Sequence, residues 1–177
     1  MNTLEWDLYF LRIAREVSKN SKCLSRKIGS VLVRDKSIIS TGYNGPAIGV
    51  KHCNERPQSF YSSLETPGQP VIDDRMCYNE CPRRHLGYKS GEGLHLCQAG
   101  HSERNALIQA AKNGISTLGT TLYCYCGIPC KDCSIEIVNA GIKELICLVK
   151  DKNYDNYSEV ILNEAGIIIR TVKEELL

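Results

Sequence analysis

The chain has 177 residues and a formal net charge of +2, from 22 Lys and Arg against 20 Asp and Glu. This length allows a sizeable core without disulfides, so we expect one domain over residues 1–177. The near-neutral charge argues against a protein that coats nucleic acid, and the absence of an 18-residue apolar run argues against a membrane span. The first residues lack a basic region followed by an apolar stretch, so we expect a cytoplasmic protein.

The one unusual feature of the composition is its ten cysteines. Ten in 177 lies below the roughly 8–10% that marks small disulfide scaffolds. In a reducing compartment such thiols serve as metal ligands, catalytic groups or small buried hydrophobic residues. We therefore assign a role to each cysteine from its position along the chain.

The N-terminal part of the chain predicts a helix and a hairpin. Apolar residues recur at helical spacing from Leu4 to Val17. Strands are predicted over Ile28–Val33 and Ser37–Thr41, on either side of a turn at Asp35-Lys36. An insertion over about residues 46–97 then shows little periodicity, and it contains prolines, glycines and cysteines. A segment this long without regular structure needs a stabilising element inside a compact domain, and a bound metal would provide one.

The second half of the chain alternates helices and strands. Helices are predicted over His101–Asn113, Cys130–Ala140 and Ser158–Ala165, and strands over Thr120–Tyr125, Glu144–Val149 and Ile167–Ile169. Strands that alternate with helices of about ten residues indicate parallel strands joined by crossovers. We therefore expect an α/β fold, a three-layer α/β/α sandwich around a mixed five-stranded sheet whose first pair is the antiparallel hairpin.

The strongest chemical signal combines a histidine with two cysteines further along the chain. Cys130 and Cys133 are three residues apart at the start of a helix, so both thiols can bind one ion. The positive end of that helix favours the thiolates. His101 begins another helix and supplies a third ligand. Three protein ligands leave the fourth position for water, as in catalytic zinc sites.

Glu103 lies two residues beyond His101 and is placed to act on that water. Zinc lowers the pKa of bound water toward about 7, and a carboxylate beside it can take the proton and return it to the leaving group. The pattern H-x-E…P-C-x-x-C is a zinc-deaminase signature. The alternative is that Cys130 and Cys133 belong to a closed structural site or a redox pair, with Glu103 a charge favoured by the helix dipole.

These motifs resemble the deoxycytidylate (dCMP) deaminase family over about residues 21–169. The matching segments are Lys27-Ile28-Gly29, Gly42-Tyr43-Asn44-Gly45, His101–Ala106, Pro129–Cys133 and Ala140–Lys143. The Gly42–Gly45 segment separates this family from cytidine, guanine and tRNA adenosine deaminases, whereas Ser102 stands where the family usually has alanine. The resemblance implies a cytidine-deaminase-like fold and hydrolysis of dCMP to dUMP and ammonia, supplying dUMP for thymidylate synthesis. In the reaction that the resemblance implies, Glu103 protonates the ring nitrogen and then the departing ammonia.

The resemblance also implies binding residues and regulation. It places Asn44 at the sugar hydroxyl, Tyr154 and Tyr157 against the substrate, Arg26 at the 5′-phosphate, and Gly42, Tyr43, Gly45 and Lys27 at an effector. The alternatives are a glycine-rich turn, a solvated basic face and ordinary exposed tyrosines. Family members are commonly hexamers activated by dCTP and inhibited by dTTP. The resemblance thus implies a homohexamer, with Mg accompanying a triphosphate effector.

A second, structural zinc is implied by likeness to microbial and phage members of the family. Its ligands here would be Cys23, Cys53, Cys81 and Cys97, with His95 or Cys77 as substitutes for one of the last two. Four thiolates would explain how the insertion is held. The alternative is a set of reduced buried thiols. The remaining cysteines, Cys124, Cys126 and Cys147, are expected to be core residues.

Two other functions compete with dCMP deamination. One is a deaminase of another substrate, namely tRNA adenosine, a free base or nucleoside, or dCTP. The other is a binding module stapled by zinc, against which Glu103 argues, because a structural zinc needs no adjacent proton carrier. The expected partners are a small nucleotide and its effectors, with no nucleic acid and no membrane.

Overall fold

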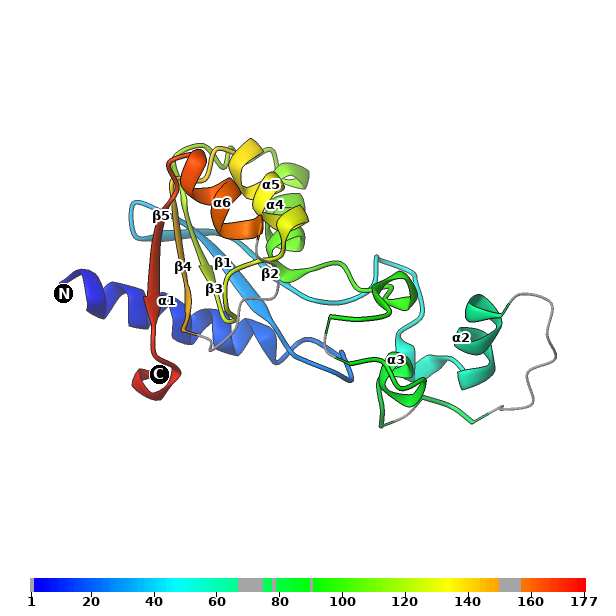
Figure 1. Ribbon diagram of the computed structural model, residues 1–177. Helices are drawn as coiled ribbons and strands as arrows, with labels where there is room; N and C mark the ends of the chain where they lie inside the picture. The colour runs from blue at the N-terminus through cyan, green and yellow to red at the C-terminus, as the bar shows by residue number, and fades with distance from the viewer. Residues whose placement is uncertain (1, 67–74, 78, 90, 150–156) are drawn as a thin grey trace. The chain divides into compact units, whose positions relative to one another are not determined.

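The computed structural model describes residues 2–66, 75–77, 79–89, 91–149 and 157–177 (Figure 1). The chain divides into two compact units. The first comprises Met1–Ser21, Ile28–Asn44 and His101–Leu177, and the second comprises Lys22–Lys27 and Gly45–Gly100. The insertion expected over about residues 46–97 falls within the second unit, and the expectation of one domain over residues 1–177 stays a prediction.

The first unit is organised by a mixed sheet, which in the described part of the chain has five strands in the order β2-β1-β3-β4-β5. The strands are β1 (Gly29–Arg34), β2 (Ser37–Tyr43), β3 (Thr121–Cys124), β4 (Glu144–Leu148) and β5 (Ile168–Val172). β1 pairs antiparallel with β2 and with β3, whereas β3, β4 and β5 are parallel. Asp35 and Lys36 form the hairpin turn with positive φ of 48° and 61°, as a two-residue connection requires. The predicted mixed sheet is confirmed.

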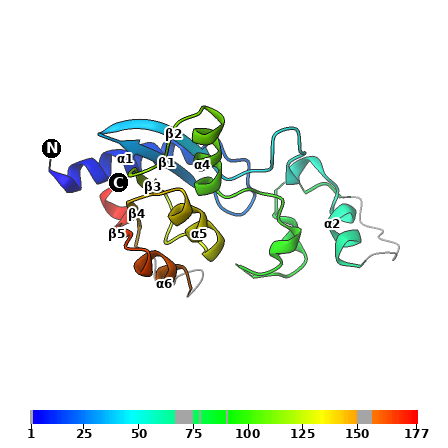
Figure 2. The same ribbon diagram turned by 90° about the horizontal axis from the view of Figure 1, so that it is seen from above.

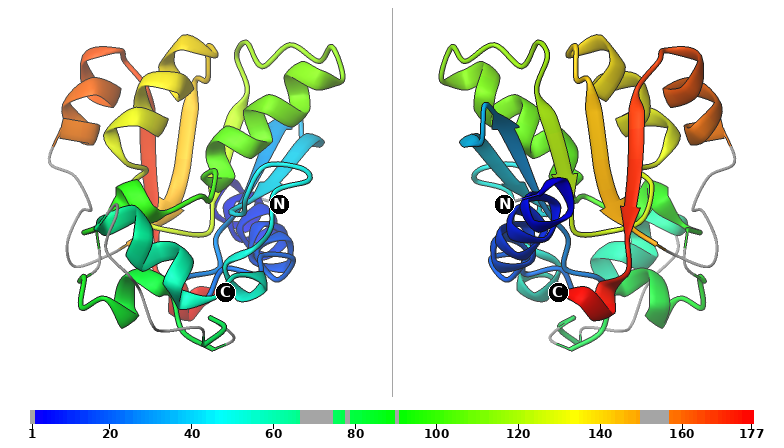
Figure 3. Two further views of the ribbon diagram at one scale, coloured as in Figure 1. Left: turned by 90° about the vertical axis from the view of Figure 1, so that its right-hand side faces the viewer. Right: turned by 90° about the vertical axis from the view of Figure 1, so that its left-hand side faces the viewer.

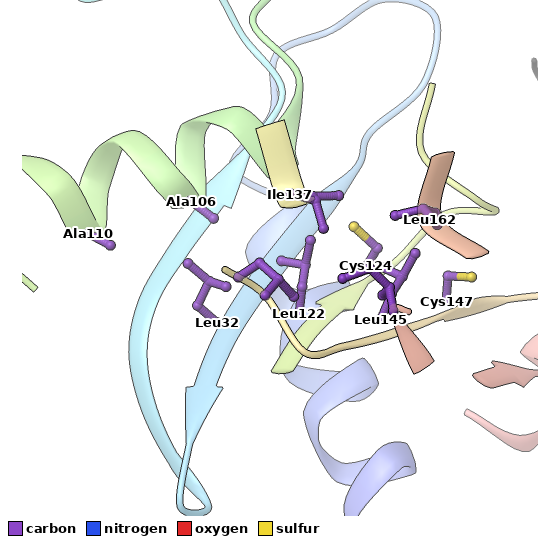
Figure 4. Packing of buried hydrophobic residues seen from close by; sticks show 11 residues of the cluster. Leu32, Ala106, Ala110, Leu122, Cys124, Ile137, Leu145, Cys147 and Leu162 are labelled. Atoms are coloured by element: carbon purple, nitrogen blue, oxygen red, sulfur yellow. The ribbon is translucent and has the colours of Figure 1, made fainter. Parts of the chain in front are cut away.

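Helices cover both faces of this sheet, which confirms the three-layer prediction. They are α1 (Thr3–Ser18), α4 (Ser102–Lys112), α5 (Lys131–Asn139) and α6 (Tyr157–Glu164), and the unit ends in the short helix η3 (Glu174–Leu176). Figure 3 shows α4, α5 and α6 on one side of the sheet and α1 on the other. Each face has its own core. Phe10 and Leu11 of α1 pack on Val31 and Ile146, and Leu32, Leu122 and Leu145 face the other helices (Figure 4).

α4 lies along the β1–β2 hairpin (Figure 2), and this contact positions the start of the helix. A Cβ on Gly42 would lie 2.3 Å from the backbone nitrogen of Ala106 and 2.3 Å from the carbonyl oxygen of Ser102, so only glycine fits. The Asn105 side chain donates to the Tyr43 carbonyl at 2.7 Å. The end of β2 therefore fixes the first turn of α4, where His101 and Glu103 stand.

A partly buried ion-pair network ties α1 to the far edge of the sheet. Arg170 on β5 donates to both oxygens of Asp7 at 2.9 and 3.0 Å, and to Glu144 at 2.7 Å. Asp7 is buried and also accepts a hydrogen bond from Tyr123 at 3.2 Å. The strand prediction stopped at Ile169, whereas β5 continues through Arg170 to Val172, because the network and the β4 pairing hold these polar residues in the sheet.

The second unit contains short helices where the sequence showed little periodicity. They are η1 (Cys53–Glu55), α2 (Gln58–Glu65), α3 (Pro82–His85) and η2 (Leu94–Leu96). Pro57 stands before α2, and α2 buries only Gln58 and Tyr61, so it presents no apolar stripe for a periodicity analysis to find. Among the residues described, no helix has the length and apolar character needed to cross a membrane.

Candidate functional site

The first unit brings together the three predicted ligands of a catalytic metal. The Nδ1 atom of His101 lies 3.3 Å from the Sγ atom of Cys130 and 3.3 Å from that of Cys133. The ligand atoms of all three residues lie within 4.8 Å of one another. One imidazole nitrogen and two sulfurs at this separation fit the donor set of a zinc site with an open fourth position.

Two of these ligands stand at helix starts. His101 is the N-cap of α4 and Cys130 is the N-cap of α5, and neither side chain makes a capping hydrogen bond. Both helices were predicted to begin at these residues, and each begins one residue later. The side chains are thus left available to a metal, at the positive ends of two helix dipoles that favour thiolates.

Hydrogen bonding distributes charge unequally between the two thiols. A hydrogen bond from Cys133, with another from His101, lowers the pKa of the Cys130 thiol to about 4. The hydrogen bond to Cys130 and burial raise the pKa of Cys133, and the hydrogen bond to Cys130 raises that of His101. Without metal, the two thiols therefore share a proton between them, with deprotonation favoured at Cys130. A metal must displace protons to bind, so its affinity falls as the pH falls.

Glu103 lies in the first turn of α4 and is 4% exposed. Its Oε2 atom accepts a hydrogen bond from the Ser102 hydroxyl at 2.9 Å, and the Ser102 hydroxyl lies 2.7 Å from that of Ser30 on β1. The carboxylate is thus held by a chain of two serines. The sequence drew attention to Ser102 only as a small residue in place of alanine, and nothing in it pointed to Ser30.

Arg104 links the two helices that carry the ligands, a role that the sequence interpretation missed. Its side chain pairs with Glu136 of α5 at 2.9 Å and approaches Asp132 at 4.0 Å. The neighbouring Glu136, Cys133 and Cys130 raise the pKa of Arg104, while burial opposes this. A positive charge thus stands beside the thiols, which favours their deprotonated form.

The nucleotide-binding residues expected from the family likeness are divided between the two units. Asn44 is buried, and its Oδ1 accepts a hydrogen bond from the Ile28 backbone at 2.8 Å. Tyr43 and Tyr157 are exposed in the first unit, whereas Arg26, Lys27 and Gly45 belong to the second. Tyr154 lies outside the described residues. The roles assigned to these residues stay predictions.

The four cysteines expected to hold a second zinc line one cavity of about 30 Å³ in the second unit. They are Cys23, Cys53, Cys81 and Cys97. Burial raises the pKa of the Cys53 thiol. Within the described residues, no three of these sulfurs lie within 4.8 Å of one another. The two alternative ligands of this zinc contact other side chains: His95 pairs with Glu65 at 3.0 Å, and Cys77 donates to Gln58 at 3.1 Å.

Comparison with known families identifies the fold and the metal-binding motifs. The family model described as the cytidine and deoxycytidylate deaminase zinc-binding region matches residues 4–149. The chain belongs to this deaminase family. The motifs expected to bind metal therefore lie within a zinc-binding region, and the family resemblance inferred from the sequence is confirmed.

Several relatives of this chain are named deoxycytidylate deaminase. That of Schizosaccharomyces pombe is 32% identical over 166 residues, which cover 93% of this chain and 43% of the relative. That of Enterobacteria phage T4 is 36% identical over 178 residues, covering 94% and 90%. The chain thus spans less than half of the yeast relative and most of the phage one.

Solved structures support the same fold. The apo dCMP deaminase of cyanophage S-TIM5 superimposes with a TM-score of 0.66 at 23% identity, covering 97% of this chain and 100% of the phage chain. A structure of the same phage protein in complex with dCMP and dUMP gives a TM-score of 0.64 at 22% identity, covering 97% and 99%. The expected cytidine-deaminase-like fold is therefore confirmed.

Proposed function

We propose that this deaminase hydrolyses dCMP to dUMP and ammonia, and so supplies dUMP for thymidylate synthesis in the cytoplasm. The observation that carries the proposal is the convergence of His101, Cys130 and Cys133 within 4.8 Å, next to the buried carboxylate of Glu103. Relatives named deoxycytidylate deaminase support the choice of substrate, as does the phage neighbour solved with dCMP and dUMP.

His101, Cys130 and Cys133 would hold the zinc. When bound, zinc supplies a water nucleophile whose pKa is lowered toward about 7. Glu103 would accept one proton from the attacking water and deliver it to the ring nitrogen, where it stays. It would then pass the second proton, taken from the added hydroxyl, to the amino group that leaves as ammonia. The Ser102 hydroxyl holds one oxygen of Glu103, which keeps the carboxylate oriented while it carries the proton.

Recognition and regulation form part of the same proposal. Asn44, Tyr154 and Arg26 would contact the nucleotide, and Gly42, Tyr43, Gly45 and Lys27 would contact an effector. The effectors are dCTP as activator and dTTP as inhibitor, bound with Mg by a homohexamer. Family likeness supports these assignments.

A second zinc would stabilise the second unit. Cys23, Cys53, Cys81 and Cys97 already surround one small cavity, and His95 and Cys77 lie bound to other side chains. Closing the four sulfurs on one ion would tie together the chain segments that carry them.

Release of ammonia from dCMP, deoxycytidine, dCTP and a tRNA by the zinc-loaded protein tests the proposed reaction. We expect turnover of dCMP. In Glu103→Gln the rate should fall by about 10²–10⁴, the usual contribution of a general acid–base, with the zinc content unchanged. Glu164→Gln, which changes an exposed carboxylate on α6, serves as the matched control and should keep the wild-type rate.

Three results would contradict the proposal. If the protein prefers another of these compounds, that compound is the substrate in place of dCMP. If none of them releases ammonia, the chain is a zinc-stabilised binding module instead. A fully active Glu103→Gln variant would disprove the mechanism while leaving the substrate in place.

A further inference from the structure

Glu103 belongs to a second group of metal-ligand side chains. A carboxylate oxygen of Glu103 and the sulfurs of Cys124 and Cys126 all lie within 4.8 Å of one another. In the part of the chain that the structure describes, only this group and His101, Cys130 and Cys133 bring three such ligands so close. The second group shares no ligand with the first.

The two thiols converge at the end of β3. Cys124 is the last residue of β3, and Cys126 follows two positions later, in the bend after the strand. Cys124 is fully buried beneath α5, where Figure 4 shows it close to Ile137. Cys126 is only half-buried, and its sulfur lies 3.0 Å from the Gly127 carbonyl. The half-buried thiol gives the group a side open to ions from solvent.

The donor set selects the class of metal. Two thiolates with one carboxylate suit zinc and the softer cadmium, whereas magnesium and calcium prefer oxygen ligands alone. Without a metal the group is compatible with the core, because burial and the Cys126 thiol raise the pKa of Cys124 and keep it neutral. Cys124 and Cys126 can therefore pack as core residues, as expected, and still bind a metal.

We propose that Glu103, Cys124 and Cys126 form an inhibitory site for an additional zinc or cadmium ion. Each thiol releases its proton to solvent as the two sulfurs and the carboxylate bind the ion. Glu103 is then committed to a cation and cannot accept the proton of the attacking water. The inhibition rests on the proposed function, in which Glu103 carries that proton, whereas binding of the metal does not.

Metal binding is tested first, without reference to turnover. Zinc-loaded protein is dialysed against increasing Cd²⁺, and the bound cadmium, the retained zinc and the ultraviolet sulfur-to-cadmium absorption band are measured. We expect the wild type to bind one more cadmium than Cys126→Ser at unchanged zinc, with the additional band missing in the variant. Cys124→Ser should behave like Cys126→Ser, because both remove a thiolate ligand. Equal cadmium binding and equal bands in wild type and both variants would overturn the site.

Inhibition is tested by adding excess Zn²⁺ to the dCMP assay. We expect Cys126→Ser to keep the basal rate and to need about tenfold more zinc for half-inhibition, since even loss of a supporting residue weakens metal sites by 10–100-fold. Cys147→Ala removes a buried thiol of β4 outside the group and should respond like the wild type. If the variant and the wild type are inhibited equally, the inhibitory role is wrong. If dCMP proves not to be the substrate, the cadmium experiment still decides whether the site exists.

Discussion

At the scale of single residues, the carboxylate that we propose to be catalytic depends on neighbours that carry no charge. Glu103 is buried, and the Ser102 hydroxyl donates to it at 2.9 Å. Since Ser102 uses its proton on Glu103, Ser30 must donate to Ser102 across their 2.7 Å contact. A strand of the sheet and the first turn of a helix therefore orient one carboxylate together.

Ser102→Ala tests this support. Loss of a hydrogen bond to a charged group costs about 1.5 kcal/mol, so we expect kcat to fall about tenfold while KM and zinc content stay unchanged. Ser40→Ala is the matched control, because Ser40 donates to the Ala106 carbonyl of the same helix without touching Glu103. It should lower stability and leave kcat intact. Equal kcat values in Ser102→Ala and wild type would show that Glu103 is oriented by other contacts.

At the scale of elements, backbone packing sets the positions of the proposed metal ligands. β2 reaches the first turn of α4 at Gly42 with no room for a side chain, and Arg104 joins α4 to α5 through Glu136. His101 belongs to the first of these helices and Cys130 to the second. The geometry of the metal site is therefore set by how two helices pack on the sheet and on each other.

Gly42→Ala should disturb the metal site from a distance. The added methyl group meets backbone atoms of Ser102 and Ala106, which cannot rotate away, so we expect a loss of about 2–3 kcal/mol in the free energy of unfolding. His101 should shift with the helix, and zinc should dissociate faster to a chromogenic chelator. Gly114→Ala places a methyl group in open space just beyond the other end of α4, at a φ of +66°. This control should lose about 1 kcal/mol to backbone strain and keep its zinc.

At the scale of the whole molecule, the ten cysteines are divided between two compact units. The first unit holds Cys130 and Cys133 of the proposed catalytic centre, together with Cys124 on β3, Cys126 after it and Cys147 on β4. The second holds Cys77 and the four that line one cavity. If each unit binds its own ion, one chain carries two zinc ions with independent roles.

Cys81→Ser separates these roles. We expect purified wild-type protein, freed of excess metal, to contain two zinc ions, and the variant to contain one. The variant should keep its dCMP deaminase rate at low temperature but unfold at a lower temperature, since the second ion acts on stability. Cys130→Ser is the complementary variant, expected to lose activity and to retain the other zinc. A zinc content of one in the wild type would remove the second site.

The sequence predicts most of the fold because its signals are local. The hairpin turn at Asp35, the helix starts at His101 and Cys130 and the alternation of strands with helices all follow from residues close together in the chain. The convergence of His101 with Cys130 and Cys133 was predictable because metal chemistry constrains which residue types must meet. The pairing of Asp7 with Arg170 and of Ser30 with Ser102 was not, because tertiary packing brings together residues 163 and 72 positions apart.

His101 and Cys130 occupy the positions where helices are normally capped, yet neither caps its helix. A missing cap costs about 1 kcal/mol, so α4 and α5 each begin with weakened first turns. An ion bound to both residues would join the two helix starts and hold their uncapped first turns in place. In metal-free protein these turns should open locally, and their amide protons should exchange with solvent long before those of the sheet. The active site would thus be the first part of the unit to fray, and metal loading would complete its folding.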